Sequence, residues 1–526
     1  MNIRSIIKTT AVVSIAATIA GCTKNFEDFN TNKHEATQDQ MLTDDNLTGA
    51  LFQQIERTVI LYRDGTGTLD SDYQVTYNLC ADIWAGYCAP TLGDGRNNGS
   101  FYINDNWCRS MFVNKYSKSM NAWVTLSEIA EESGLTQTAA IADILKVTTM
   151  HQVTDYYGAV PYSKVGTSLT PEYDSQESIY RQMLSELDEA ISVLSDYHAA
   201  DPAATVMAKF DIVYGGNVEK WIKFANTLRL RLAMRCSYAD ESLARTEAEK
   251  SINDPIGIIT ENSDNAVVSG VDHHPIYEIN VNFNDADCQI GAALDCYLNG
   301  FDDPRKFIYA KPANDGELHG VRNGIPTTNW TPYKNTANNV SAPNATNYDI
   351  VWINAAEAYF LRAEYELRWG SASTAKDLYE EGIRKSFEEW GASGADTYIA
   401  STNSAASFVD AVDNNNAPDP SDVSIAFNTA DDFETNLERI ITQKWLAVFP
   451  NGCEGWAEYR RTDYPHLIAP VTNNSEGVVD SDLQIRRVPY PISEQSENPS
   501  GLAQGISLLG GPDNAGTRLW WDQKPR

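Results

Sequence analysis

Positive charge is scarce in this 526-residue chain, which has 40 Lys and Arg against 72 Asp and Glu, and a formal net charge of −32 at pH 7. Nucleic acids and phosphate-rich surfaces attract positively charged proteins, so the composition argues against both as partners. Neutral and cationic ligands remain compatible with it. The basic residues that do cluster are predicted to pair with the chain's own carboxylates: Lys220, Lys223, Arg229, Arg231, Arg235, Arg460, Arg461, Arg486 and Arg487.

Recognisable catalytic and cofactor motifs are also missing. The chain has no G-x-S-x-G, no phosphate-binding G-x-x-x-x-G-K-[ST] and no H-E-x-x-H. The adjacent His273 and His274 are more typical of a turn than of a metal site, and Asp413–Asp422 lacks the spacing of a calcium loop. We therefore expect no enzyme activity, no cofactor and no metal. The many carboxylates leave a glycosidase-like pair open.

Cysteines are few and do not form a recognisable framework. Seven follow Cys22, at positions 80, 88, 108, 236, 288, 296 and 453, and no C-x-x-C is present. Cys80 and Cys88 are eight residues apart, as are Cys288 and Cys296. This spacing allows a local disulfide within each pair but is not evidence that either one forms. The pairing stays open, and scattered buried thiols are the favoured state.

The N-terminus carries a targeting signal. Arg4 and Lys8 precede the uncharged, mostly apolar stretch Thr9–Ala20, which is too short to span a membrane, and the segment ends in Ile19-Ala20-Gly21-Cys22. This pattern predicts a signal peptide over residues 1–21 and a lipidated Cys22 that begins a polar stalk over residues 22–50. The alternative is an ordinary signal with a cysteine near its cleavage site. Without Arg4 and Lys8 the charge becomes 38 minus 72, or −34.

Apolar residues at helical spacing predict a scaffold of helical hairpins. In Tyr348–Gly370, they are Ile353, Ala356, Phe360, Ala363 and Leu367, and Gly370 is a natural stop. Thr374, with Asp377 three residues later, predicts the start of the next helix, which ends at Gly391. Further helical stripes begin at Ile141, Tyr180, Trp221 and Leu437, and a first helix is expected near Asn46–Thr58. The spacing is too irregular for a uniform tandem array.

Three long insertions interrupt this scaffold, over about residues 61–108, 251–348 and 392–431. They are rich in Gly, Asn, Asp and Pro, and loops of this length are usually functional or form a subdomain. The first two also carry many aromatic residues, whereas the third resembles plain surface. We therefore expect a mostly α-helical domain over residues 51–526 that contains these insertions.

Several sequence blocks together resemble one known family. They run from Phe26–Asn32, Thr154–Tyr162 and Lys220–Asn226 through Ala356–Glu364, Tyr379–Ile383 and Gln443–Trp445 to Asn451-Gly452, Glu458–Thr462, Arg486–Pro491 and Trp520–Asp522. In this number and order they resemble the SusD/RagB family of outer-membrane lipoproteins, in its SusD-like branch. The resemblance implies a tetratricopeptide-type fold, a lipid anchor in the outer membrane and exposure at the cell surface. It also implies a role in capturing nutrients for a TonB-dependent (SusC-like) transporter.

The resemblance does not identify the ligand, so the candidate site comes from side-chain chemistry. Flat Tyr and Trp rings stack on the apolar faces of sugars, and nearby amides and Arg bind their hydroxyls. This favours oligosaccharides as the ligand. Oligopeptides are the alternative, and a surface glycan-degrading enzyme is a third reading. The candidate binding residues are Trp84, Tyr87, Arg96, Asn97, Asn98, Tyr102, Trp107, Trp330 and Tyr333. Each aromatic residue taken alone is also compatible with ordinary packing.

Overall fold

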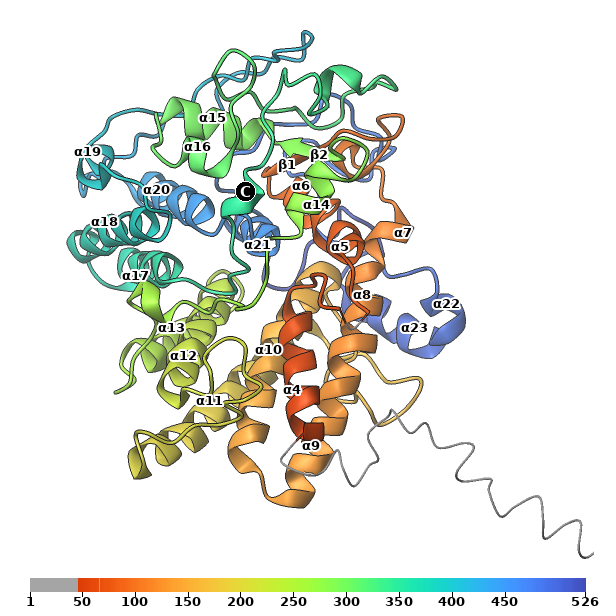
Figure 1. Ribbon diagram of the computed structural model, residues 1–526, viewed down its shortest axis with the longest axis vertical. Helices are drawn as coiled ribbons and strands as arrows, with labels where there is room; N and C mark the ends of the chain where they lie inside the picture. The colour runs from red at the N-terminus through yellow and green to blue at the C-terminus, as the bar shows by residue number, and fades with distance from the viewer. Residues whose placement is uncertain (1–45, 66) are drawn as a thin grey trace, which may run out of the picture. The chain divides into compact units, whose positions relative to one another are not determined.

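Helices dominate the computed structural model, which describes residues 46–65 and 67–526 (Figure 1). The predicted signal peptide, Cys22 and all of the stalk before residue 46 lie outside these residues. Helix α4 spans Asn46–Val59, close to the predicted first helix, and residues 51–526 form one compact unit. Within the described residues, no helix is both long and apolar enough to cross a membrane.

The scaffold consists of long helices that pack against their neighbours in sequence (Figure 1). Helix α10 contacts α9 and α11, α12 contacts α11 and α13, and α17 contacts α18 and α20. The bounds are α9 Asn121–Ser133, α10 Thr136–Tyr157, α11 Gln176–Ala200, α12 Val218–Arg235, α13 Glu241–Ile252, α17 Ala355–Trp369, α18 Ala372–Glu389, α20 Phe433–Ala447 and α21 Gly452–Thr462. Apart from end residues such as Ile353, the predicted helical stripes fall in these helices, and the helical-hairpin fold is confirmed.

The α17–α18 hairpin also corrects two details of the prediction. Helix α17 begins only at Ala355, because the Asn354 side chain caps it by accepting from the Glu357 backbone N–H, so Ile353 lies before the helix. Helix α18 begins at Ala372, because the Ser371 hydroxyl accepts from the backbone N–H of Thr374. Thr374 is therefore inside the helix and is not its N-cap.

Small residues let these two helices approach closely. Ala356 and Ala363 on α17 are completely buried. On α18, a Cβ atom added to Gly382 would lie 2.9 Å from the Phe360 ring of α17. The alanines in the predicted stripe thus mark a tightly packed helix–helix contact.

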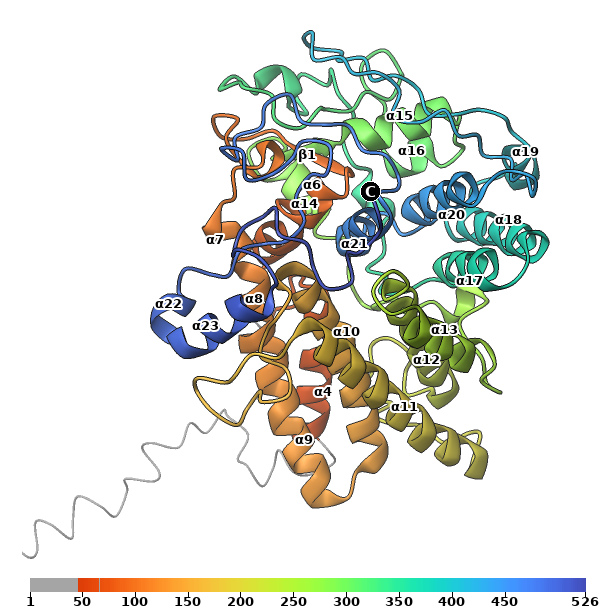
Figure 2. The ribbon, with the colours of Figure 1, turned by 180° about the vertical axis from the view of Figure 1, so that it is seen from behind.

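The insertions contain short elements rather than continuous loops. The helices are α5 Asp70–Tyr73, α6 Ala81–Trp84 and α7 Asp105–Cys108 in the first, α14 Ile276–Val281, α15 Ala292–Gly300 and α16 Lys306–Tyr309 in the second, and α19 Ala395–Ile399 in the third. Strand β1 (Cys88–Pro90) of the first insertion pairs antiparallel with β2 (Cys288–Ile290) of the second. Helix α8 (Ser110–Asn114) follows α7, and Figure 2 shows α22 (Glu494–Glu497) and α23 (Pro499–Leu508) beside it.

A buried ionic network joins the scaffold helices. Arg231 of α12 pairs with Glu357 of α17 at 2.6 Å. Arg235 and Lys444 both bind Glu454 of α21, at 2.6 and 2.7 Å. The predicted internal pairing of the basic residues is thus confirmed for these arginines, and it also holds for Lys220, Lys223, Arg229, Arg461, Arg486 and Arg487.

Arg460 departs from that prediction. Its guanidinium donates to the backbone carbonyl oxygens of Asp155 and Arg486, and its central carbon lies 3.4 Å from the centroid of the Trp456 ring. Burial lowers its pKa to about 9. Arg460 therefore fastens α21 to backbone and to an aromatic ring rather than to a carboxylate.

The seven cysteines among the described residues are all free, as favoured from the sequence. Six are buried and Cys453 is half-buried. The Cys80 and Cys108 sulfur atoms lie 4.0 Å apart, about twice the length of a disulfide bond. The thiols therefore act as small apolar core residues.

Candidate ligand-binding site

The three insertions, far apart in the sequence, come together beside the helical scaffold (Figure 1). Strands β1 and β2 join the first to the second. The indole N–H of Trp330 in the second donates to the carbonyl oxygen of Gly93 in the first at 2.9 Å. The Arg322 guanidinium donates to the carbonyl oxygen of Asn416 in the third at 2.8 Å. The insertions therefore build one common surface, with the first two joined by a strand pair.

Most of the predicted binding residues lie inside this assembly instead of on its surface. Trp84 is only 1% exposed, its ring centroid lies 4.7 Å from that of Trp456, and its N–H donates to the Asn98 carbonyl oxygen. Tyr87 is fully buried, and its hydroxyl donates to the Trp445 carbonyl oxygen at 2.6 Å. Neither ring has a free face, so the prediction that they stack on a ligand is wrong.

The second pair of predicted aromatic residues is buried as well. Trp330 and Tyr333 form a T-shaped pair with centroids 5.6 Å apart, and they pack against Val321 and Ile325. They close a small apolar cluster beneath the loop surface. Because both rings are buried, the prediction that Trp330 and Tyr333 stack on a ligand is corrected as well.

Asn97 and Asn98 use their amides to shape the loop. The Asn97 Oδ1 accepts from the backbone N–H of Gly99 at 2.9 Å. The Asn98 Oδ1 accepts from the backbone N–H of Asn104 at 3.0 Å, and its Nδ2 donates to the Leu79 carbonyl oxygen. Both side chains are buried, so they position the following residues and do not present amides to a ligand.

Three of the predicted residues keep accessible side chains. Tyr102 is 50% exposed, and its backbone N–H donates to the Asn97 carbonyl oxygen, which fixes it to the buried part of the loop. Trp107 on α7 is half-buried against the core. Arg96 is exposed, and its guanidinium and backbone N–H bind Asp94 and lower the pKa of that carboxyl. Tyr102, Trp107 and Arg96 thus remain as candidate contacts on one loop.

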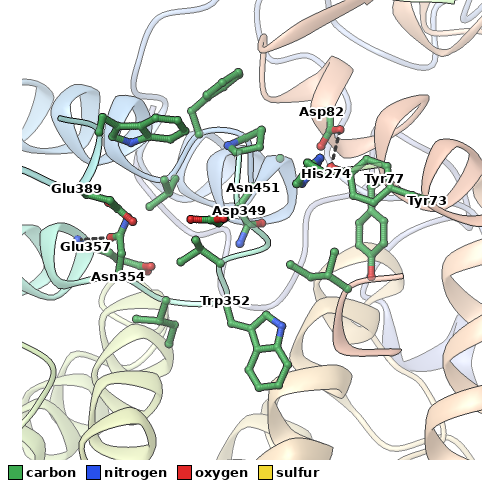
Figure 3. A pocket seen from close by; sticks show the side chains of 18 of the residues that line it. Tyr73, Tyr77, Asp82, His274, Asp349, Trp352, Asn354, Glu357, Glu389 and Asn451 are labelled. Carbon is green, nitrogen blue, oxygen red and sulfur yellow. Dashed lines mark hydrogen bonds between the residues drawn. The ribbon is translucent and has the colours of Figure 1, made fainter. Parts of the chain in front are cut away.

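A cavity of about 70 Å³, which the sequence did not indicate, lies between the first two insertions and helices α17, α18 and α21 (Figure 3). Aromatic side chains form much of its wall, with Tyr73 and Tyr77 from the first insertion, Trp352 ahead of α17, and Trp390 and Phe449 at the ends of α18 and α20. Sequence periodicity could not reveal it, because the residues come from separate segments and most lie at helix ends.

Carboxylates dominate the polar lining of this cavity, which includes Asp82, Asp349, Glu357 and Glu389. Among the described residues that line it there is no Lys or Arg, and burial lowers the pKa of His274 to about 3, so this imidazole is neutral at pH 7. Glu357 is bound from behind by Arg231. No ion pair joins any of the other three carboxylates to the described part of the chain.

Two of these carboxyls are held in an unusual protonation state. Burial raises the pKa of Glu389 to about 8, and Asp349 adds to the shift, despite the hydrogen bond that Asn354 donates to Glu389 at 2.8 Å. Burial likewise raises the pKa of Asp82 to about 7, although Asn78 and Tyr73 donate hydrogen bonds to it. In both cases the cost of burying a charge in a low-dielectric site outweighs the groups that favour the ionised form, so protonation is favoured.

The described residues show no metal centre, since no group of three His, Cys, Asp or Glu side chains among them is arranged to hold an ion. The fold thus displays long, contact-linked insertions on a helical-repeat scaffold.

The comparisons with known proteins assign the chain to a family. The model of the SusD-like family "Susd and RagB outer membrane lipoprotein" matches residues 28–522. The structure is similar to that of a chitin-binding SusD homologue from Flavobacterium johnsoniae, with 36% identity, a TM-score of 0.85, and coverage of 91% of this chain and 99% of that one. A SusD homologue from Bacteroides uniformis is 34% identical, with a TM-score of 0.84 and coverage of 91% and 100%. No curated protein matches the chain.

The chain belongs to the SusD/RagB family. It is an outer-membrane lipoprotein with a tetratricopeptide-type helical fold, and it is a binding protein, not an enzyme. These findings confirm the resemblance seen in the sequence blocks.

Proposed function

We propose that the protein binds oligosaccharides at the cell surface and delivers them to a TonB-dependent, SusC-like transporter. The observation that supports this ligand class is that the Tyr102 ring is half-exposed and the Trp107 ring is partly exposed on one loop of the composite surface. Flat rings of this kind stack on sugar faces with little loss of side-chain freedom, because Tyr and Trp side chains have only two rotatable bonds that position the ring. The chitin-binding homologue, at 36% identity, supports a glycan ligand.

Calorimetric titration tests the ligand class. The panel contains chitin-derived oligosaccharides, other neutral oligosaccharides, and cationic and neutral peptides of similar length. We expect saturable binding of at least one neutral oligosaccharide in the micromolar to millimolar range, which corresponds to about 4–8 kcal/mol. Binding of peptides alone would contradict the proposal.

Oligopeptides remain the second candidate, because one observation favours them. The chain without its predicted signal has a formal charge of −34, which attracts cationic peptides at low salt. Peptide binding would then weaken steeply as salt rises. Affinity for a neutral oligosaccharide would change little over the same range, so a salt series separates the two candidates.

The anchor is proposed to be acyl chains on Cys22, which lies outside the described residues. Cys22→Ala should remove the acyl mass and release the protein from the membrane fraction, since each buried CH₂ contributes about 0.8 kcal/mol to anchoring. Cys453→Ala, at a half-buried thiol, is the matched control and should stay in the membrane fraction. Retention of the Cys22 variant with no change in mass would contradict lipidation at this residue.

The transporter partnership has its own test. Affinity capture of the tagged, lipidated protein from detergent-solubilised outer membranes should retain a TonB-dependent transporter, identified by mass spectrometry. Its absence from captures made at low and at moderate salt would contradict the proposed delivery step.

A further inference from the structure

We propose that the acidic, aromatic-walled cavity is a second binding site, separate from the oligosaccharide surface, and that it takes a primary ammonium group. The cavity combines four carboxylates, aromatic walls and, in its described lining, no Lys or Arg (Figure 3). A charged primary amine would donate hydrogen bonds to the carboxylates and place a positive charge beside the aromatic rings.

A hydrogen-bond acceptor without a partner indicates that a donor belongs in this cavity. Gln152 lines it and is 7% exposed, and its Oε1 has no hydrogen-bond partner in the described part of the chain. A buried acceptor without a donor is costly to the folded state, so such atoms call for a bound group. An ammonium group carries three donors and no acceptor.

Other groups in the cavity wall would also attract a cation. Figure 3 shows the Asp349 side chain pointing toward the side of the cavity where Glu389 and Asn354 lie. Trp352 and Trp390 also line the cavity, and an aromatic ring face attracts an ammonium most strongly where water is excluded. Among the described residues, the indole N–H groups of both tryptophans have no hydrogen-bond partner, and water or a hydroxyl next to the amine would accept from them.

The volume limits the buried part of the ligand. A cavity of about 150 Å³ holds benzene, so the 70 Å³ here fits a head group of about three or four non-hydrogen atoms. The exposed Asp349 lies at the mouth, so the rest of a longer ligand would extend into solvent. The site thus fits the ammonium end of an aminated ligand, such as a lysine side chain or an amino sugar.

Binding of a cation here should be coupled to loss of a proton. The titratable and charged groups that face Glu389 and the cavity are Asp82, Asp349, Glu357, His274, Tyr73, Tyr77 and, beside Glu389, Arg305. Glu357 is engaged in its ion pair with Arg231, and burial keeps His274 and both tyrosines uncharged near pH 7. With the pKa of Glu389 at about 8, the affinity for an ammonium ion should fall by up to about 100-fold from pH 9 to pH 6.

Titration with ethylammonium chloride tests the proposal on the intact protein by calorimetry or NMR, at pH 9 and constant ionic strength. Ethanol is the matched neutral probe. A ligand of three non-hydrogen atoms binds no tighter than about 0.5 mM, so we expect a saturable, low-millimolar dissociation constant for ethylammonium and none for ethanol. Glu389→Gln should weaken ethylammonium binding at least tenfold, and Glu388→Gln, at the exposed neighbour on the same helix, should leave it within twofold.

Several outcomes would overturn the proposal. They are no saturation with ethylammonium, equal binding of ethanol, a response to sodium or calcium without one to ethylammonium, and an unchanged affinity in Glu389→Gln. If Glu389→Gln does not fold, Asp349→Asn at the exposed mouth replaces it, with the same tenfold loss expected. Oligosaccharide affinity is measured in the same variants and should be unchanged, so failure of this proposal leaves the proposed function untouched.

Discussion

Removing Arg461 should destabilise the protein strongly, because this guanidinium holds two buried carboxylates at once. It binds both oxygens of Glu364 at 2.6 Å and the Glu458 Oε2 at 2.5 Å, and all three side chains are at most 2% exposed. Breaking a buried pair by deleting one partner typically costs about 3–5 kcal/mol, since the remaining charge stays buried without compensation.

The pKa of Glu364 gives an independent magnitude. Burial favours its protonated form, but Arg461 and Arg368 outweigh this and lower the pKa from 4.5 to about 2. A shift of that size corresponds to about 3 kcal/mol of stability. Because the pKa is lowered in the folded state, this contribution is complete above about pH 4.5 and is lost as the pH falls toward 2. Arg461→Met should therefore lose most stability near pH 7 and progressively less toward pH 2.

Urea denaturation between pH 7 and pH 3 measures both effects. Arg245→Met, which removes the exposed partner of Glu249, is the matched control and should cost little, because solvent screens that pair. The double variant Glu364→Met/Arg461→Met should recover part of the loss, since an apolar pair leaves no uncompensated charge at position 364. A loss in Arg461→Met no larger than in Arg245→Met would refute the reasoning.

Two further predictions concern packing. Ala356→Leu and Ala363→Leu should each overpack the close contacts of α17 and lower the free energy of unfolding by about 1–3 kcal/mol; unchanged thermal unfolding in both would mean that this face is not tightly packed. Trp84→Ala should lower stability by about 3–5 kcal/mol because it empties a fully packed site, while oligosaccharide affinity of the remaining folded protein stays unchanged. If a stable Trp84→Ala variant instead lost its oligosaccharide affinity, Trp84 would be part of the binding site.

The scaffold could be predicted because helical periodicity depends on local spacing. The stripes beginning at Ile141, Tyr180, Trp221 and Leu437 all lie in long helices whose apolar faces are buried. Helix starts were less certain, since Ser371 and Thr374 are both plausible caps, and only the hydrogen bond between them shows which one the helix uses.

The binding residues were harder to predict, because aromatic content does not reveal exposure. Trp84 and Tyr102 occur in the same Gly- and Asn-rich insertion, yet Trp84 packs on Trp456, more than 300 positions later, and Tyr102 is half-exposed. Asn97 and Asn98 likewise look available for a ligand until their loop partners are seen. Such long-range contacts leave no local pattern in the sequence.

The cavity was not predictable for a related reason. Asp82, Asp349 and Glu389 come from three separate segments, and each is an ordinary acidic residue in a strongly acidic chain. Their distinguishing property is that they line one cavity and form no ion pair within the described residues, which appears only once the segments are assembled.

The central claim is that Tyr102 and Trp107 form the oligosaccharide contact, and one calorimetric comparison tests it most directly. The best-binding neutral oligosaccharide is titrated into the wild type, Trp107→Ala, and Phe307→Ala, an exposed aromatic of α16 outside this loop. Truncating a central aromatic contact commonly costs about 2 kcal/mol or more. We predict at least a tenfold loss of affinity in a Trp107→Ala variant that stays folded, and no loss in Phe307→Ala. Equal affinity in the wild type and Trp107→Ala would contradict the account.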